Sequence, residues 1–305
     1  MENYEESLTA FVSCFARSYH ATNSVKPIFN DFAAKKLLRP EEISFLTSIW
    51  TKAIYFFDPE RAAFFCNEEE KLNWVMNTQC VPQLVSRAKY AEDQLLMAIQ
   101  RGVRQYVILG AGLDTFALRQ KNFPQDFRIY EIDLPHTQTF KIERLKEMGI
   151  SIPDNLKFVP VDFSSDSLQD ELKKAGFDEQ EWSFFSLLGV SMYLDSKDFL
   201  QLLTLVSKIS PRGSSFVFDY LDETALTQYA SKKMLQMREM TAQTGEKIKT
   251  VFDPLKLDYE IQATNMLLYE NLSPEQIEEL YFWNQDNDLH AFDHFHFAHL
   301  VNNKE

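Results

Sequence analysis

The spacing of apolar residues changes along the chain and divides it into two regions. In the N-terminal region apolar side chains recur every three or four residues, as at Leu8, Phe11 and Phe15, and this pattern predicts amphipathic helices. Pro40, followed by two glutamates, is typical of a helix start, because the first helical turn tolerates proline and favours negative charge. We therefore expect a helical cap over residues 1–83.

From about residue 84 onwards, short β-rich runs alternate with helical stretches, as in proteins whose parallel strands are connected by helices. This alternation predicts an α/β fold with a Rossmann-like sheet over residues 84–305. The expected strands cover residues 106–109, 127–130, 157–160, 183–187 and 215–218, and the helices between them cover residues 114–119, 138–148, 167–174 and 196–209.

A Met- and charge-rich helical stretch over residues 223–244 interrupts this alternation. We expect an insertion at about residues 222–250 that forms a helical lid over the strand ends. Ser273 and Pro274 further on suit the N-cap and first position of a helix. Since no linker or repeat is evident, we expect one domain over residues 1–305. The C-terminal elements expected are a helix over 254–262, a strand over 266–269, a helix from 273 and a strand near 294–301.

Composition narrows the possible partners. Hydrophobic residues make up 45% of the 305 residues and aromatic residues 14%, which indicates a packed interior rather than disorder. The net charge of -14, without a basic patch, disfavours nucleic acid as a partner. The acidic start and the lack of a long apolar run predict neither secretion nor a membrane span. Cys14, Cys66 and Cys80 lie far apart and fit reduced thiols of a cytoplasmic protein.

The most informative stretch is Val107–Thr115, where a predicted strand runs into a turn with Gly110 and Gly112 and then into a helix. Glycine permits a tight turn and a close approach of ligand to backbone. Alone, such a pair also fits an ordinary strand-to-helix turn. Asp133, however, ends the next strand 23 residues after Gly110 (133 − 110). That spacing matches the acid that binds the ribose hydroxyls of an adenosine-containing cofactor.

Asp114 and Thr115 indicate which adenosine cofactor is bound. A dinucleotide site has its third glycine where this chain has Thr115, and the Asp114 carboxylate would repel a pyrophosphate at the helix N-terminus. S-adenosylmethionine has no phosphate and carries positive charge, so we favour it over a nicotinamide cofactor. Asp162 and Phe163 follow the third predicted strand and suit adenine, by hydrogen bonding and ring packing respectively. Phe163 fits a plain core position as well.

Several sequence motifs, taken in order, resemble those of the leucine carboxyl methyltransferase family. The resemblance extends from about residue 63 to residue 301. The phrases Phe218-Asp219-Tyr220 and His294–Ala298 are similar to those of its bacterial branch, which includes polyketide O-methyltransferases. The other phrases that carry the resemblance are Arg87, Leu109–Thr115, Glu131–Pro135, Asp162-Phe163 and Gly189–Leu194.

The resemblance implies a class I methyltransferase fold with a seven-stranded, mostly parallel sheet and S-adenosylmethionine as the cofactor. It places the methionine end of the cofactor near the glycine turn, and Arg87 against a carboxylate, a role that suits a guanidinium. Without the resemblance, Arg87 fits a surface position on a helix. Leu188 departs from the family, since many members have glutamate there, and Phe116 stands where arginine is common. The candidate cofactor-binding residues are Arg87, Gly110, Ala111, Gly112, Asp114, Glu131, Asp133, Asp162, Phe163, Leu188 and Gly189.

Methyl transfer from a sulfonium is an in-line displacement, which depends on alignment and on exclusion of water. We expect the acceptor to be an oxygen of a small molecule. A carboxylate, with a pKa of about 4, needs no general base, whereas a hydroxyl does. Tyr193 and Tyr220 are the nearest polar candidates for that role, although we favour simple packing for each. No catalytic residue is otherwise predicted.

Two other hypotheses remain: a nicotinamide-dependent oxidoreductase on the same fold, and a sensor that binds the cofactor without catalysis. A metal site is a further alternative, because His294 and His296 share one face of the last predicted strand. No cysteine lies near them to complete a familiar zinc site, and Phe295 and Phe297 alternate with them as in a half-buried strand. We expect a structural strand and no metal.

Overall fold

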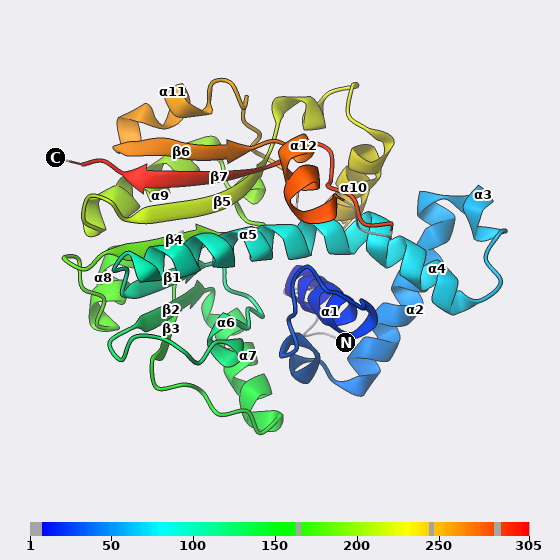
Figure 1. The fold of residues 1–305 in the computed structure, drawn as a ribbon, viewed down its shortest axis with the longest axis horizontal. Coiled ribbons are helices and arrows are strands. Elements are labelled where there is room, and N and C mark those ends of the chain that lie inside the picture. Colours follow the sequence, from blue (N-terminus) through cyan, green and yellow to red (C-terminus); the bar gives the residue numbers. More distant parts are fainter. Residues whose placement is uncertain (1–7, 163–165, 244–246, 284–287, 305) are drawn as a thin grey trace.

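The computed structural model describes residues 8–162, 166–243, 247–283 and 288–304. Its centre is a seven-stranded sheet in the order β3-β2-β1-β4-β5-β7-β6. The first five strands run parallel, and β7 lies antiparallel to both β5 and β6, which confirms the predicted α/β class and the mostly parallel sheet (Figure 1). The strands are β1 (Gln105–Leu109), β2 (Arg128–Asp133), β3 (Leu156–Pro160), β4 (Ser183–Leu187), β5 (Ser215–Leu221), β6 (Met266–Leu272) and β7 (Phe295–Asn302).

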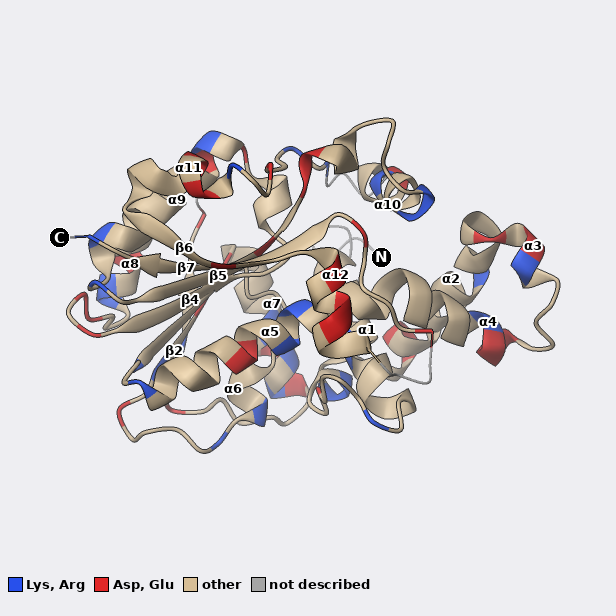
Figure 2. Ribbon diagram, turned by 45° about the horizontal axis from the view of Figure 1, so that its top comes forward, with Lys and Arg blue, Asp and Glu red and all other residues tan. Residues whose placement is uncertain are grey.

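Helices cover both faces of the sheet, as Figure 2 shows from the side. One face carries α5 (Val81–Gln100), α6 (Phe116–Arg119) and α7 (Pro135–Glu147); the other carries α8 (Leu168–Lys174), α9 (Ser196–Ile209) and α11 (Leu257–Ile261). Alternate residues of β1 enter the two cores, Ile108 on the α5 side and Leu109 on the α9 side. A parallel strand buried on both faces is expected to be mainly apolar, and β1 is apolar from Tyr106 to Leu109, with all five of its residues buried.

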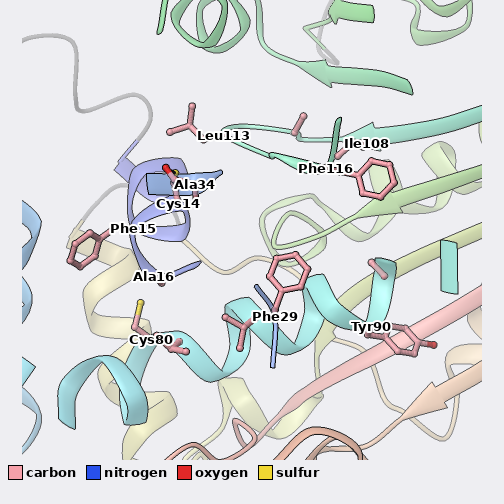
Figure 3. Packing of buried hydrophobic residues seen from close by; sticks show 14 of the residues in the cluster. Cys14, Phe15, Ala16, Phe29, Ala34, Cys80, Tyr90, Ile108, Leu113 and Phe116 are labelled. Carbon is pink, nitrogen blue, oxygen red and sulfur yellow. The ribbon is translucent and has the colours of Figure 1, made fainter. Parts of the chain in front are cut away.

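The N-terminal cap comprises α1 (Leu8–Asn23), η2 (Ala34–Leu37), α2 (Pro40–Phe57), α3 (Pro59–Ala62), α4 (Glu68–Val75) and η3 (Met76–Cys80). Pro40 begins α2 as predicted, and the Glu42 side chain accepts a hydrogen bond from the Arg39 amide. One apolar core runs from the cap to the sheet without a break. In Figure 3 Phe15 and Cys80, from the cap, belong to the same cluster as Tyr90 of α5 and Ile108 of β1. Cys14 and Cys80 are buried, whereas Cys66, between α3 and α4, is exposed.

The lid differs from the single helix predicted over residues 223–244. It consists of η5 (Glu223–Leu226) and α10 (Lys232–Gln243), separated by an irregular segment. The break arises because short polar side chains bind local backbone amides instead of continuing a helix. Within the break, the Thr227 hydroxyl donates to the Thr224 carbonyl and accepts a hydrogen bond from the Tyr229 amide, and Ser231 accepts one from the amide of Met234 in α10. Asp222 caps the start of η5 by accepting from the amides of Thr224 and Ala225.

The C-terminal elements follow the predicted order. The helix expected over 254–262 is shorter, as α11 followed by η6 (Gln262–Thr264). Ser273 caps α12 (Pro274–Ile277), with Gln276 completing a reciprocal capping pair, and η7 (Glu278–Phe282) continues it. Within the described part of the chain, no helix combines the length and the apolar character needed to cross a membrane.

Candidate functional site

The candidate site lies where the direction of the sheet connections reverses. The chain passes from β1 outwards to β2 and β3, then returns to place β4 on the other side of β1. In open α/β sheets ligands bind beyond the carboxyl ends of the strands at this point. Here the turn after β1, which contains Gly110 and Gly112, meets the turn after β4, which contains Gly189.

Both turns need glycine for two reasons. Gly110 has φ of 72° and Gly189 has φ of 71°, in the left-handed region that disfavours other residues. A Cβ at Gly110 would lie 2.6 Å from Cγ2 of Val190, and a Cβ at Gly189 would lie 2.5 Å from Nη1 of Arg87. The sequence thus allows close packing of the two turns and of Arg87 against them.

Most of the predicted cofactor-binding residues meet around one cavity of about 400 Å³, which we call the donor cavity. Its wall includes both predicted turns, the end of β2 and part of α5. Phe163 lies outside the described residues, so its predicted contact with adenine stays a prediction. The predicted residues that line the donor cavity are Arg87, Gly110, Ala111, Gly112, Asp114, Asp133, Asp162, Leu188 and Gly189.

Asp133 is held at the edge of the donor cavity by the backbone. Its Oδ2 accepts a hydrogen bond of 2.6 Å from the Gly112 amide, and its Oδ1 accepts one of 2.8 Å from the Leu134 amide. Each carboxylate oxygen can accept a further hydrogen bond. The predicted ribose acid is therefore fixed in orientation relative to the glycine turn.

Asp114 also lines the donor cavity, and its carboxylate caps the short helix α6. Its Oδ1 accepts a hydrogen bond of 2.7 Å from the Phe116 amide, while its carbonyl accepts one from Nζ of Lys141. The acid thus occupies the helix N-terminus at which a dinucleotide's pyrophosphate would bind.

Glu131 does not line the donor cavity. It lies two residues before the end of β2, and its side chain is covered by α7, where Nζ of Lys141 donates a 2.5 Å hydrogen bond to it. Burial raises the pKa of Glu131 to about 7, although Lys141 opposes the shift. The structure assigns Glu131 an internal ion pair rather than the cofactor contact expected from sequence.

Arg87 lies over Gly189 and is fixed by Asp219 of β5. The fully buried Asp219 carboxylate accepts hydrogen bonds from Nη1 of Arg87 at 3.2 Å, from the Gln83 amide side chain at 3.1 Å and from the Gly189 backbone amide at 2.6 Å. Asp219 thereby joins α5, β4 and β5. Sequence reasoning did not select Asp219, although the phrase Phe218-Asp219-Tyr220 signalled it.

The cap contributes to the donor cavity through α1, which sequence reasoning also missed. Arg17 of α1 lines the cavity and donates to the carbonyl of Leu113 at 2.7 Å and to Asp31 at 2.8 Å. Thr115 and Arg119 also contact Asp31. Burial opposes ionisation of Asp31, but Arg17 and Arg119 outweigh it and lower its pKa. This buried network ties the cap to the glycine turn.

A second cavity, of about 340 Å³, adjoins the first, and we call it the acceptor cavity. Its wall is mainly apolar and comes from α1, α2, the lid helix α10 and the segment before β7. Tyr193, at the end of η4 (Ser191–Tyr193), lines both cavities. The residues common to both walls are Thr9, Leu84, Arg87, Gly189 and Tyr193.

Tyr220 lies away from both cavities, contrary to the candidate role given to it. It is within β5, 1% exposed, and its hydroxyl donates to Oδ1 of Asn271 at 2.8 Å. Its ring stacks on His296, with the centroids 5.1 Å apart. Burial also raises the pKa of Tyr220 well above its ordinary value, and its contacts give it a packing role in the core.

The C-terminal histidines have structural partners. His294 precedes β7 with φ of 70°, and its ring contacts Asp222 while accepting a hydrogen bond from the Ser231 amide. Nε2 of His296 lies 3.7 Å from the Asp222 carboxylate. These contacts join the start of the lid to β7. In the part of the chain that the structure describes, no three His, Cys, Asp or Glu side chains are grouped so as to hold a metal ion.

Comparisons with known proteins point to methyltransferases. The family model described as leucine carboxyl methyltransferase matches residues 10–207. YktD of Bacillus subtilis, named as a candidate S-adenosyl-L-methionine-dependent methyltransferase, is 39% identical over 99% of both chains. A Mycobacteroides abscessus protein given the same description is 29% identical over 86% of this chain and 82% of its own.

Solved structures share the fold at low sequence identity. A DUF574-family protein from Streptomyces avermitilis matches with a TM-score of 0.58 and 13% identity, over 95% of this chain and 97% of its own. A candidate methyltransferase from Thermobifida fusca matches with a TM-score of 0.53 and 15% identity, over 79% of this chain and 90% of its own. Both likenesses concern the fold alone.

Proposed function

This chain belongs to the leucine carboxyl methyltransferase family, and from that premise we propose that it is an S-adenosylmethionine-dependent methyltransferase that methylates an oxygen atom of a small molecule. The observation that carries the proposal is the pair of adjoining cavities. One is walled by the glycine turn and Asp133, the other is mainly apolar, and Arg87, Gly189 and Tyr193 line both.

The donor cavity fits S-adenosylmethionine in its chemistry. The turn with Gly110 and Gly112 brings backbone to the cavity wall, and Asp133 presents oriented oxygens suited to two ribose hydroxyls. Arg87 suits a carboxylate, which it would bind through its guanidinium while Asp219 fixes its position. When bound, the cofactor supplies an electrophilic methyl group on a sulfonium.

The acceptor cavity would serve the reaction by positioning and by excluding water. In-line displacement requires the acceptor oxygen to lie close to the methyl carbon, opposite the sulfur. The residues common to both cavities mark where that alignment would occur, next to Gly189 and Tyr193. A mainly apolar wall removes competing water and strips the nucleophile of hydration. A carboxylate acceptor would need no base there.

Calorimetric titration with S-adenosylhomocysteine, with NAD as the competing ligand, tests the cofactor. We expect binding of the first and none of the second. NAD binding without S-adenosylhomocysteine binding would reject the proposal.

The acceptor atom is tested by incubating the protein with methyl-labelled donor and a metabolite extract, and then treating the labelled products with base. Methyl esters release labelled methanol, and methyl ethers keep the label. Either result supports transfer to oxygen, and the release distinguishes a carboxylate from a hydroxyl acceptor. Label found only on nitrogen, carbon or sulfur, or on no product at all, would contradict the proposal.

A further inference from the structure

One cation stands out in the mainly apolar wall of the acceptor cavity. Lys233, in the first turn of α10, lines the cavity together with aromatic and Met side chains such as Trp50, Phe57 and Met240. Its Nζ lies 3.5 Å from the ring centroid of Phe292. Among the described residues, the Lys233 ammonium has this aromatic contact but neither a hydrogen bond nor an ion pair.

The surroundings of Lys233 leave its charge poorly compensated. Burial lowers its pKa to about 8, although Asp293 and Glu278 oppose that shift from a distance. Glu278 is itself engaged by the ring of His290 and by the Ala291 amide. A lysine normally extends its ammonium into water, as its exposed neighbour Lys232 does. The Lys233 ammonium is partly buried and has an aromatic ring but no carboxylate beside it, so its charge is only partly compensated, and a bound anion would complete that compensation.

Arg87 makes a useful contrast with Lys233. Both line the acceptor cavity, but Arg87 is paired with Asp219 and also lines the donor cavity. Lys233 lines the acceptor cavity but not the donor cavity. A ligand's reacting oxygen would lie at the shared wall, next to Gly189, so Lys233 would meet a different part of the same ligand.

We propose that Lys233 is a specificity-determining residue that binds an anionic group of the acceptor, separate from the oxygen that is methylated. The acceptor is then a small molecule with an apolar body that fills the cavity, and with an acidic group that pairs with Lys233. This inference rests on the proposed function for the identity of the two cavities, and it adds the chemical class of the acceptor.

A pair of fluorescent probes with the same apolar body tests the role of the charge. 1-Anilinonaphthalene-8-sulfonate carries a sulfonate, whereas N-phenyl-1-naphthylamine lacks it. Titrations use the full chain saturated with S-adenosylhomocysteine, as wild type, Lys233→Met and Lys232→Met. Methionine keeps the length and apolar stem of lysine, and Lys232 is the exposed control on the same helix.

We expect Lys233→Met to weaken binding of the sulfonate probe about tenfold and to leave binding of the neutral probe unchanged. Lys232→Met should change neither. The proposal is overturned if Lys233→Met binds the sulfonate probe like wild type. It is also overturned if both probes lose affinity equally, because the effect would then come from shape rather than charge.

The products of the labelling experiment give a second readout. A product methylated at one oxygen and still acidic elsewhere is retained by an anion-exchange resin at neutral pH, which supports the proposal; a neutral labelled product overturns it. Titration with S-adenosylhomocysteine separates this failure from failure of the proposed function. If the cofactor binds but Lys233→Met does not change the affinity for the sulfonate probe, only the inference about the acceptor is wrong. If no cofactor binds, the proposed function is wrong, whatever the probes show.

Discussion

Three carboxylates near the strand ends differ in their partners, and this difference decides which of them can meet a ligand. Asp219 is surrounded by Arg87, Gln83 and the Gly189 amide, and Glu131 by Lys141. Asp133 accepts hydrogen bonds from two backbone amides and lines the donor cavity. Asp133 is therefore the acid whose loss should affect cofactor binding most directly.

Replacing Asp133 by alanine should weaken S-adenosylhomocysteine binding by about 1–3 kcal/mol, because two hydrogen bonds to ribose are lost. Calorimetric titration measures this effect, with thermal unfolding as the check that the variant is folded. Asp154→Ala, at an exposed position away from the cavity, serves as the control and should bind normally. Equal affinity of Asp133→Ala and wild type would contradict the assignment of the ribose acid.

Gly189→Ala should cost more than backbone strain alone, since its Cβ would collide with Arg87. Gly176 offers a matched control, because it has φ of 90° but a Cβ added there would meet nothing within 4 Å. We expect Gly176→Ala to lose about 1 kcal/mol of unfolding free energy in urea. Gly189→Ala should lose more and should also bind S-adenosylhomocysteine more weakly. Equal stability and affinity of the two variants would show that Arg87 can move aside freely.

At the scale of elements, two ion pairs connect the cap to α7, one from helix α2 and one from the residue that precedes it. Arg144 of α7 and Glu42 of α2 are both buried and form a bidentate pair, with distances of 2.6 and 2.7 Å. Arg39 and Glu147 connect the same two elements at the surface. One buried and one exposed ion pair thus connect the cap to the same helix.

Arg144→Met should destabilise the fold by about 3–5 kcal/mol, because it leaves the buried Glu42 carboxylate without its guanidinium. Arg39→Met should cost less than about 1 kcal/mol, since exposed pairs contribute little. Chemical denaturation of both variants measures the difference. Similar losses for the two would mean that burial does not set the strength of this attachment.

The elements are predictable where one local pattern determines them. The first residues of the five parallel strands lie close to their predicted positions, since each strand is a short run rich in β-branched, aromatic and other apolar residues. The lid segment is rich in helix-forming residues along its whole length and predicts one helix, whereas Thr227 and Ser231 interrupt it by hydrogen bonding to neighbouring backbone groups. Such competition depends on side-chain geometry, which a helical pattern does not contain.

The site is predictable where spacing alone brings residues together. Gly110 and Asp133 follow adjacent parallel strands, so both have to reach the same edge of the sheet. The prediction for Glu131 is wrong because the pattern does not show that Lys141 covers it. Arg17 and Asp219 escape prediction because their roles depend on contacts between segments far apart in sequence.

At the scale of the whole molecule, buried histidines connect stability to pH. Burial lowers the pKa of His20 and of His299 to about 4. Between about pH 6.5 and pH 4 these histidines bind protons in the unfolded chain but stay neutral in the folded chain. Each of them therefore lowers the free energy of unfolding as pH falls from 6.5 towards 4. Glu131 acts in the opposite direction, because its raised pKa of about 7 adds stability as pH falls through 7.

Comparing variants isolates the histidine contribution. Between pH 7 and pH 5 the wild type should lose about 2 kcal/mol of stability through His20 alone. His20→Asn should lack this part of the pH dependence, whereas His136→Asn, at an exposed position, should keep it. Urea unfolding at both pH values gives the comparison. Parallel pH profiles for wild type and His20→Asn would contradict the prediction.

The different burial of the three cysteines makes the chain selectively reactive. Both Cys14 and Cys80 are buried, and burial raises the pKa of each thiol to about 12, so both stay protonated near neutral pH. The thiolate is the nucleophile, and Cys66 is the one exposed thiol of the three. A maleimide dye would therefore attach at the outer end of the cap without any engineered substitution. Its fluorescence could report how the cap responds when a ligand enters.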